Sequence, residues 1–533
     1  MKLQNRTVRL ASVVALTGSL GLGSVGYVYA GLVRPARVNP VTINWYYPET
    51  NSKQAAPPNL SQVEVAINRI AVPKIGVRVN LQPIAEGQYA QKMAPMLQTG
   101  EANGIVWTSN WMLPFTTEVG AHAFKPLNHL IAQRGQGLER VIGAKFLKGT
   151  AVNGTIYGIP NIQLEVRHSG IYGILLTSNV KKIAYPLKLK HVTALNYWTS
   201  PTVNSLAHLH KFLLAVHKAL PEVTPLQLSA GYDGFDSTWY GYWTVQPSAW
   251  DQNNPNLPFF IRIGKYGKTP PKITLALNAQ KQFIAMMHEW YQQGLINKNA
   301  GTMTSSQTMA APLGSSVMIG WNNAPDWTGT TGALPASEVG KYRDLLFYFN
   351  NGPLHGAYEF VGDQSTINAI AAGTTHPRHA MALLNMVNTN ARVYNLLVNG
   401  IAGVDYTKTG PNRIKYTKSG STWFQNSSWV MGDVFNGYMT NTSPGYSFNL
   451  VKKWNSSGIA SPAVGFTFNP TSVQSQIANM SSVASQWVQP LFNGVYPVSK
   501  FNQFEHQMQA AGQAQVLKAM QQQFDAWWKA AHS

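Results

Sequence analysis

Residues 41–47, with the sequence VTINWYY, are β-branched and aromatic residues that predict an extended strand. The segments that follow show helical and strand periodicity in turn. They are a helix over 61–71, a strand over 77–81, a helix over 89–98 and a short buried strand over 104–107. Strands that alternate with helices at this spacing predict βαβ units around a mainly parallel sheet, and therefore an α/β fold.

The remainder of the chain adds more helical patterns than strand patterns. Residues 229–260 are rich in Gly, aromatic residues, Asn and Pro, and predict a long surface segment with little regular structure. A small apolar strand is predicted over 315–320. Amphipathic helices are predicted over 204–220, 275–294 and 377–398, and one long final helix over 504–531.

The first thirty residues have the pattern of an export signal. A short basic stretch with Lys2, Arg6 and Arg9 precedes an apolar run over 10–30 that ends in Val28-Tyr29-Ala30. This pattern predicts a signal peptide cut after Ala30, followed by a linker over 31–40. The alternative is an uncut membrane anchor over 10–33, because an apolar run of about 20 residues can span a bilayer. In either case we expect a periplasmic or extracellular protein.

The composition is unusual for its shortage of carboxylates. The chain has 41 Lys and Arg residues against 21 Asp and Glu, a formal net charge of +20, and no cysteine. The missing cysteine excludes disulfides and lipid attachment at a cysteine. The basic residues are dispersed with short clusters, whereas nucleic-acid binders concentrate them in a patch or tail. We therefore expect no nucleic-acid partner and interpret the balance as adaptation to acid, since folds that depend on ionised carboxylates weaken near pH of about 3. The alternative is an anionic partner such as an acidic polysaccharide or the cell surface.

Several segments in the first half resemble the extracellular solute-binding proteins of family 1, the receptors of bacterial ABC importers. The resemblance is carried by the helix and turn over 89–101, the loop Trp107-Thr108-Ser109-Asn110-Trp111, the segment 123–128 and the run Asn153-Gly154-Thr155-Ile156-Tyr157-Gly158-Ile159-Pro160-Asn161. In the family, the last of these runs lies where the chain crosses from one lobe to the other.

The second half resembles the same family in the same order. The matching segments are 368–370, 376–380, 388–389 and 394–406, and the tail from Gly465 onward resembles the C-terminal domain of the lipoprotein subgroup. This chain departs from that subgroup because it lacks the lipid-anchoring cysteine and has Arg378 and His379 where members carry acidic residues. The departures leave the expected fold unchanged and put the tethering mode and the charge of the ligand in doubt.

The resemblance implies a two-lobed α/β periplasmic-binding-protein-like fold of type II, with an interlobe cleft and a hinge. The implied boundaries are lobe 1 over 41–158, lobe 2 over 159–357, a lobe 1 return over 358–415, and a lobe 2 return with a C-terminal helical domain over 416–533. The implied function is capture of a saccharide, with an oligosaccharide favoured, for delivery to the transmembrane subunits of an ABC permease. We expect a monomer with no cofactor and no catalytic activity, touching the membrane only through an uncut N-terminal segment.

Aromatic rings bind the apolar faces of sugars, and side-chain amides and carboxylates bind the hydroxyls. Candidate ligand-binding residues are therefore the aromatic and polar residues in the predicted loops. They are Trp45, Tyr47, Glu49, Asn110, Trp111, Asn161, Trp239, Tyr240, Tyr242, Trp243, Trp321, Trp327 and Tyr358. For each tryptophan the alternative is a core position, because Trp is highly buried on average, and for Glu49 it is a turn.

Other chemistries have weaker support in the sequence. His208 and His210 are two positions apart, which separates them on a helix, so we expect no metal site there. The oxygen-rich run 251–256 lacks the EF-hand Gly and terminal Glu, so a turn is favoured over calcium. A secreted acid-stable glycoside hydrolase remains an alternative, and would need two opposed carboxylates. The carboxylates available for it are Asp233, Asp236, Asp251, Glu289 and Asp326. A basic polysaccharide- or surface-binding protein is a third reading, supported by charge alone.

Overall fold

The computed structural model describes most of the chain after residue 38. The described residues are 39–49, 56–110, 112–168, 170–185, 187–195, 197–229, 235, 237–245, 259–304, 307, 315–321, 341–349, 355, 358–360, 364–418, 420, 428–440 and 445–533. The predicted signal segment over 1–30 and the linker to residue 38 lie outside them. Within these ranges, no helix is long and apolar enough to cross a membrane.

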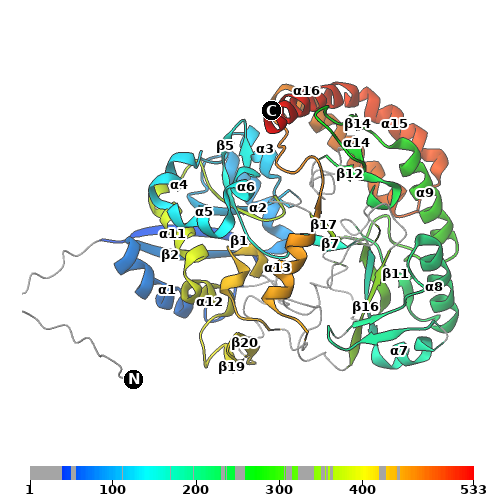
Figure 1. Ribbon diagram of the computed structural model, residues 1–533, viewed down its shortest axis with the longest axis horizontal. Helices are drawn as coiled ribbons and strands as arrows, with labels where there is room; N and C mark the ends of the chain where they lie inside the picture. The colour runs from blue at the N-terminus through cyan, green and yellow to red at the C-terminus, as the bar shows by residue number, and fades with distance from the viewer. Residues whose placement is uncertain are drawn as a thin grey trace, which may run out of the picture. The chain divides into compact units, whose positions relative to one another are not determined.

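The first sheet has five strands in the order β2-β1-β3-β18-β6. Its strands β1 and β2 lie side by side in Figure 1. Strand β1 pairs in parallel with both β2 and β3, as the βαβ pattern predicts. Strand β18 comes from far along the chain and is inserted antiparallel between β3 and β6. The chain must therefore leave this sheet after β6 and return to it as β18. The bounds are β1 Val41–Glu49, β2 Val77–Ala85, β3 Gly104–Thr108, β6 Gly158–Pro160 and β18 Ile367–Ile370.

Helices from both halves of the chain share one hydrophobic core with this sheet, which we call lobe 1. Lobe 1 includes buried residues from Ile43 to Ile159, from Ile367 to Val398, and Val430 with Met431. Its core thus extends past residue 415, where the sequence places the end of the return. The helices are α1 Leu60–Ile75, α2 Glu86–Gln98, α3 Phe115–Gly120, α4 Asn128–Arg134, α5 Gln136–Ile142, α6 Ala144–Lys148, α11 Pro377–Thr389 and α12 Ala391–Asn399. Two hairpins accompany them, formed by β4 Ala151–Val152 with β5 Thr155–Ile156 and by β19 Tyr406–Gly410 with β20 Arg413–Tyr416.

The predicted helix over 377–398 is two helices, not one. The backbone of Asn390 is extended, and its side chain accepts hydrogen bonds from the amides of Arg392 and Val393. Asn is among the residues preferred at a helix N-cap, so it starts α12 where α11 ends.

The second sheet has six strands in the order β11-β15-β8-β16-β10-β9. It is mixed, since β8 is antiparallel to both of its neighbours while β11–β15 and β10–β16 are parallel pairs. The parallel βαβ pattern predicted from residues 41–107 therefore does not extend to this part of the chain. The bounds are β8 Gly170–Leu176, β9 Lys190–Val192, β10 Tyr197–Thr199, β11 Thr224–Leu226, β15 Ser316–Trp321 and β16 Tyr342–Tyr348.

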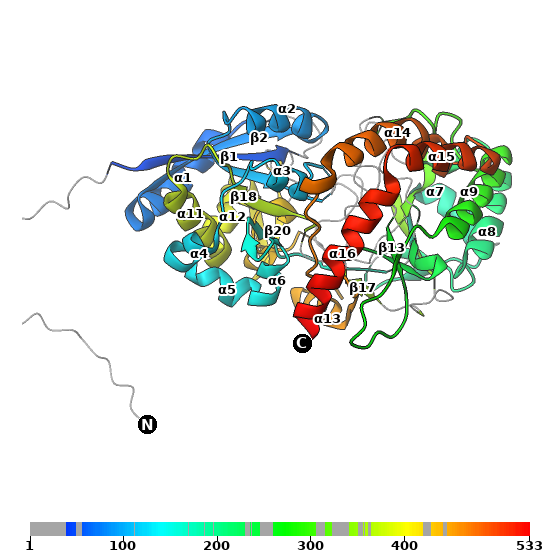
Figure 2. The same ribbon diagram turned by 90° about the horizontal axis from the view of Figure 1, so that it is seen from above.

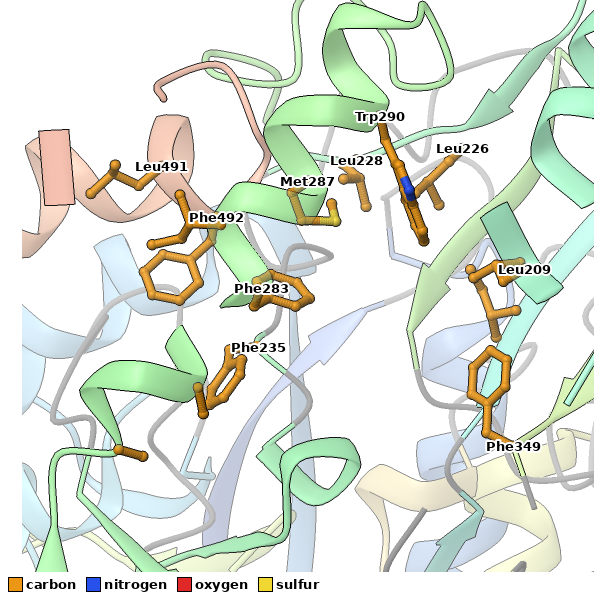
Figure 3. Packing of buried hydrophobic residues seen from close by; sticks show 14 of the residues in the cluster. Leu209, Leu226, Leu228, Phe235, Phe283, Met287, Trp290, Phe349, Leu491 and Phe492 are labelled. Atoms are coloured by element: carbon orange, nitrogen blue, oxygen red, sulfur yellow. The ribbon is translucent and has the colours of Figure 1, made fainter. Parts of the chain in front are cut away.

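A second hydrophobic core, which we call lobe 2, joins the middle of the chain to its end. It combines buried residues between Ile171 and Phe349 with buried residues between Ala463 and Trp528. Figure 3 shows Phe235, Phe283 and Phe492 meeting in it, and the Phe283 and Phe492 rings lie 6.1 Å apart. Helix α16 contacts α14, and Figure 2 shows it next to β13 of the same lobe. The helices are α7 Thr177–Ala184, α8 Leu206–Ala219, α9 Leu277–Gln292, α14 Gln474–Phe492, α15 Phe501–Ala510 and α16 Gln513–His532.

Two expectations for lobe 2 need correction. The single final helix is divided into α15 and α16 at Gly512, whose φ of 103° is incompatible with a continuing helix. The segment 229–260 is partly regular where it is described, since β12 Tyr242–Thr244 pairs with β13 Phe260–Arg262, which in turn pairs with β14 Ile273–Thr274. Its short strands lack the length that makes alternation visible in a sequence.

Candidate functional site

Three segments connect the two cores, and they lie side by side. Strand β17 (Tyr358–Phe360) pairs antiparallel with β7 (Val166–His168) and parallel with β21 (Ile459–Ala460). Each of these strands lies between a stretch that packs in lobe 1 and a stretch that packs in lobe 2. We call this three-stranded sheet the crossing sheet. Backbone hydrogen bonds therefore join the three crossings to one another.

Asn161 connects the same three crossings where they leave lobe 1. Its Nδ2 donates to Oγ1 of Thr366 at 2.8 Å and to the carbonyl of Val430 at 2.8 Å. Its Oδ1 accepts from Nδ2 of Asn368 at 2.9 Å and from the amide of Gly432 at 2.7 Å. The side chain is 2% exposed. Both its donors and its acceptor are thus used inside the protein, so in this structure Asn161 joins crossings rather than offering an amide to a ligand.

Asn161 and its four partners, Thr366, Asn368, Val430 and Gly432, form a group that we call the Asn161 hub. Two tryptophans of lobe 1 donate hydrogen bonds to this hub. The indole of Trp45 donates to Oδ1 of Asn368 at 2.9 Å, and the indole of Trp107 donates to Oγ1 of Thr366 at 2.8 Å. The ring of Trp107 also packs edge-on against Trp429. Backbone bonds from Ile162 to Gly432 and from Val434 to Ile162 complete the connection between the first and third crossings.

Gln364 forms a second connection, which reaches the C-terminal segment. Its Nε2 donates to the carbonyl of Gly149 at 2.8 Å and to Oγ1 of Thr467 at 2.9 Å, while its own carbonyl accepts from the amide of Asn110 at 2.9 Å. Gln364 therefore links a predicted ligand-binding loop, the second crossing and the start of the C-terminal segment. Asn110 itself is 5% exposed.

The candidates on β1 lie in the core of lobe 1. Trp45, Tyr47 and Glu49 are 1%, 2% and 0% exposed. They alternate with Asn44 and Tyr46, and so share the face of Ile43. The alternation itself, read from Ile43, is the signal that assigns these rings to the core. In this structure the three side chains are buried against protein, and their role in ligand binding stays a prediction.

The aromatic candidates of lobe 2 do come together. Trp239 and Tyr240 lie on a 3-10 turn, Ser237–Tyr240, which leads directly into β12 with Tyr242 and Trp243. Trp243 is 3% exposed and belongs to the core, whereas Trp239, Tyr240 and Tyr242 are half-buried around it. Trp239 packs edge-on against Phe349 at 4.8 Å, and Tyr240 lies 5.2 Å from Phe235. These half-buried rings are the described candidates that keep some exposed surface for a sugar face.

The remaining candidates stay predictions. Trp111 and Trp327 lie outside the described residues, and for Trp321 and Tyr358 only the backbone, in β15 and β17, is described. The calcium alternative over 251–256 and four of the five hydrolase carboxylates also lie outside; the fifth, Glu289, is exposed and accepts from Gln293. Within the described ranges, His, Asp and Glu side chains form no group of three or more that could hold a metal ion.

The few described carboxylates include several that are buried. Burial raises the pKa of Glu86, Glu118 and Glu505 to about 7 each. Burial likewise raises the pKa of Asp433, at the third crossing, to about 6, although the amide of Phe435 and nearby Lys452 favour its charged form. A buried carboxyl with a raised pKa is neutral in acid, so its burial costs least at low pH.

Sequence patterns did not reveal four residues of this region: Gln364, Thr366, Asn368 and Thr467. Their spacing follows no helix or strand face, and their partners are up to 318 positions away in the chain. Two of the four belong to segments that carry the family resemblance: Asn368 is part of residues 368–370, and Thr467 is part of the tail from Gly465 onward.

The two cores, their three crossings and the interleaved strand order define the fold. The fold agrees with the crystal structure of an N-glycan transport solute binding protein (NgtS) from Streptococcus pneumoniae, with a TM-score of 0.69, 20% identity, and coverage of 92% of this chain and 99% of that one. It also agrees with an HMO binding ABC-transporter associated solute binding protein from Bifidobacterium longum infantis, with a TM-score of 0.57, 13% identity, and coverage of 92% and 99%. The predicted two-lobed α/β fold of periplasmic solute-binding proteins is therefore confirmed.

Sequence comparison finds a relative with the same kind of name. A carbohydrate ABC transporter substrate-binding protein from Streptococcus pneumoniae serotype 4 is 23% identical over 484 residues, which is 89% of each chain. A family model described as a domain of unknown function (DUF3502) matches residues 462–529. That domain is a C-terminal domain of such proteins, which confirms the resemblance seen in the tail.

Proposed function

We propose that this protein is an extracytoplasmic receptor that captures an oligosaccharide between its lobes and delivers it to the transmembrane subunits of an ABC importer. The observation that carries the proposal is the likeness to a carbohydrate transporter's binding protein along 89% of both chains. A receptor of this kind performs no covalent chemistry. Its ligand contacts both lobes and thereby favours a closed arrangement that the permease recognises.

The crossing sheet and the Asn161 hub support a hinge mechanism. Hinges are a few residues between rigid bodies that absorb the change in backbone angles. Here the three crossings are joined at both levels, by strand pairing and by the amide of Asn161, so they would bend together rather than singly. We infer that the hub fixes the point on lobe 1 from which this bending begins.

The proposed ligand contacts are aromatic stacking and hydrogen bonds. From lobe 2 we propose the half-buried rings of Trp239, Tyr240 and Tyr242. From lobe 1 we propose the loop of Asn110 and Trp111. Further candidates elsewhere in the chain are Trp321, Trp327 and Tyr358. The first ligands to try are oligosaccharides of mannose and N-acetylglucosamine, since the similar NgtS was crystallised with Man1GlcNAc and Man5GlcNAc.

The experiment that tests the proposal measures whether the two lobes close when a sugar is added. Tryptophan fluorescence and the radius of gyration from X-ray scattering are measured while the chain lacking residues 1–30 is titrated with neutral and with uronic oligosaccharides. The proposal predicts a saturable fluorescence change together with a smaller radius for at least one sugar. A chain that shows neither change with any sugar, and that releases reducing ends, would instead be the hydrolase.

A further inference from the structure

The positive charge of lobe 2 is concentrated in one part of it. Between Glu165 and Glu222 the chain has seven Lys and Arg residues and no Asp or Glu, a formal charge of +7 against +20 for the whole chain. Residues 222–357, the rest of the first passage through lobe 2, have eight basic and eight acidic residues. The excess therefore belongs to the segment that contains α7, β9 and α8.

The lysines of this segment are exposed. Lys181 and Lys182 lie in the last turn of α7, Lys188 follows that helix, and Lys190 is the first residue of β9. Lys211 and Lys218 lie on α8 at a spacing that puts them on one helix face. Helices α7 and α8 contact each other, and Figure 1 shows them together at the end of lobe 2. We call these six lysines the α7–α8 basic surface.

Apolar side chains are exposed within the same surface. Tyr185, between Lys182 and Lys188, is 93% exposed, the largest value among the exposed hydrophobic residues described. Leu214, on the face of α8 between Lys211 and Lys218, is 40% exposed. Lysines around an exposed aromatic residue are the combination that binds a lipid surface, since Lys is attracted to anionic headgroups and Tyr favours the headgroup level.

We propose that the α7–α8 basic surface binds the anionic headgroups of a membrane and keeps the receptor near it. Charge complementarity and the position of Tyr185 carry the proposal. Its use rests on the proposed function, because a receptor held at the membrane surface stays close to its permease. The binding itself does not depend on any sugar.

The test is co-sedimentation with vesicles, using the chain lacking residues 1–30 so that the apolar segment does not contribute. Vesicles of phosphatidylcholine with phosphatidylglycerol are compared with phosphatidylcholine alone. The fourfold variant Lys181→Glu, Lys182→Glu, Lys188→Glu and Lys190→Glu is expected to bind the anionic vesicles at least tenfold more weakly, since each Lys near an anionic surface contributes about fivefold. Tyr185→Ala is expected to weaken vesicle binding severalfold and to leave binding of soluble polygalacturonate unchanged.

A matched control is available on another exposed basic segment of lobe 2. Arg262, Lys265, Lys268 and Lys272 are equally numerous and exposed, without an exposed aromatic residue among them. Their reversal to Glu should weaken vesicle binding less than twofold. Equal loss in both fourfold variants would show an effect of net charge and overturn the proposal, as would wild type without preference for anionic vesicles. Binding of polygalacturonate but not of vesicles would assign the surface to acidic polysaccharides instead. The sugar-induced fluorescence change should persist in every variant, which separates this proposal from the receptor function.

Discussion

The side-chain amides of Asn161 and Asn368 are joined at 2.9 Å, although they are 207 positions apart in the sequence. Asn161 directly follows β6, from which the chain leaves lobe 1, and Asn368 is the second residue of β18, the strand by which the chain returns. Both are almost fully buried, at 2% and 1% exposure. This pair fixes two crossings to each other at the edge of a single sheet, which is the geometry that a shared hinge requires.

Replacement of Asn161 should therefore destabilise the protein strongly. In Asn161→Ala the backbone amide of Gly432 and one N–H of Asn368 lose their buried acceptor, and each such loss costs roughly 1–3 kcal/mol, while the carbonyl of Val430 keeps its hydrogen bond from Asn368. We expect the free energy of unfolding to fall by about 3 kcal/mol or more, measured by urea denaturation. Asn128→Ala, which removes an exposed bond to the amide of Ile156, should cost about 1 kcal/mol or less. If both variants lost a similar amount of unfolding free energy, the hub would not contribute more to stability than an exposed hydrogen bond.

The C-terminal segment should be an integral part of lobe 2 rather than an accessory. Phe524 of α16 is fully buried in the core and packs edge-on against Phe466 at 5.1 Å. Phe524→Ala should lower the free energy of unfolding by about 3–5 kcal/mol. Gln522 is an exposed neighbour of Phe524, and Gln522→Ala should change the free energy of unfolding by less than about 0.5 kcal/mol. If Phe524→Ala left the main unfolding transition unchanged, the segment would fold independently of lobe 2.

The buried carboxyl of Glu118 should make stability depend on pH. Its Oε2 is buried without a hydrogen-bond partner, and burial raises its pKa to about 7 against 4.5 in the unfolded chain. Below pH of about 4.5 it is protonated in both states and costs nothing; above pH of about 7 it must ionise in place or remain protonated at a cost, while the unfolded chain ionises freely. Glu118→Gln should therefore raise the melting temperature at pH 8 and leave it nearly unchanged at pH 4.

The sign of this effect has a direct check. The melting temperatures of wild type and Glu118→Gln are compared across that pH range by scanning calorimetry. A difference that is constant with pH would show that the carboxyl does not titrate as its burial requires. Glu139→Gln, a change of an exposed carboxyl on α5, is the matched control.

The half-buried ring of Trp239 should contribute to sugar binding. Aromatic contacts of this kind are worth about 0.5–1.5 kcal/mol, so Trp239→Ala should weaken the affinity by roughly three- to tenfold. Trp487 is a suitable control, since it is also half-buried but its ring contacts Tyr496 and its indole donates to Gln507 within the C-terminal helices. Isothermal titration with the best sugar measures both variants. An unchanged affinity in Trp239→Ala would remove this ring from the proposed site.

The sequence predicted the outline of the fold better than its interior. The strand at residues 41–47 and the helix and strand patterns up to residue 107 all appear at the expected positions, because a buried α/β sheet imposes strong periodicity on its elements. The mixed sheet of lobe 2 was not predicted, since strand direction leaves no periodic pattern in a sequence. The break at Gly512 was missed because the apolar pattern continues on both sides of it.

The candidate site was likewise predicted only in part from the sequence. Aromatic composition drew attention to Trp45 and Tyr47, yet their alternation with Asn44 and Tyr46 places them in the core. Asn161 was selected for a ligand contact and is used instead for connections within the protein. Connections such as Gln364 to Thr467 join residues about a hundred positions apart, and only the folded chain brings them together.

Isothermal titration calorimetry of the chain lacking residues 1–30, with neutral oligosaccharides of mannose and N-acetylglucosamine, tests the central claim most directly. The sugar is afterwards recovered and its length determined by chromatography. A receptor gives saturable heat at one sugar per chain and returns the sugar intact. Absence of saturable heat across the neutral and uronic sugars, or recovery of shortened sugar, would contradict the account.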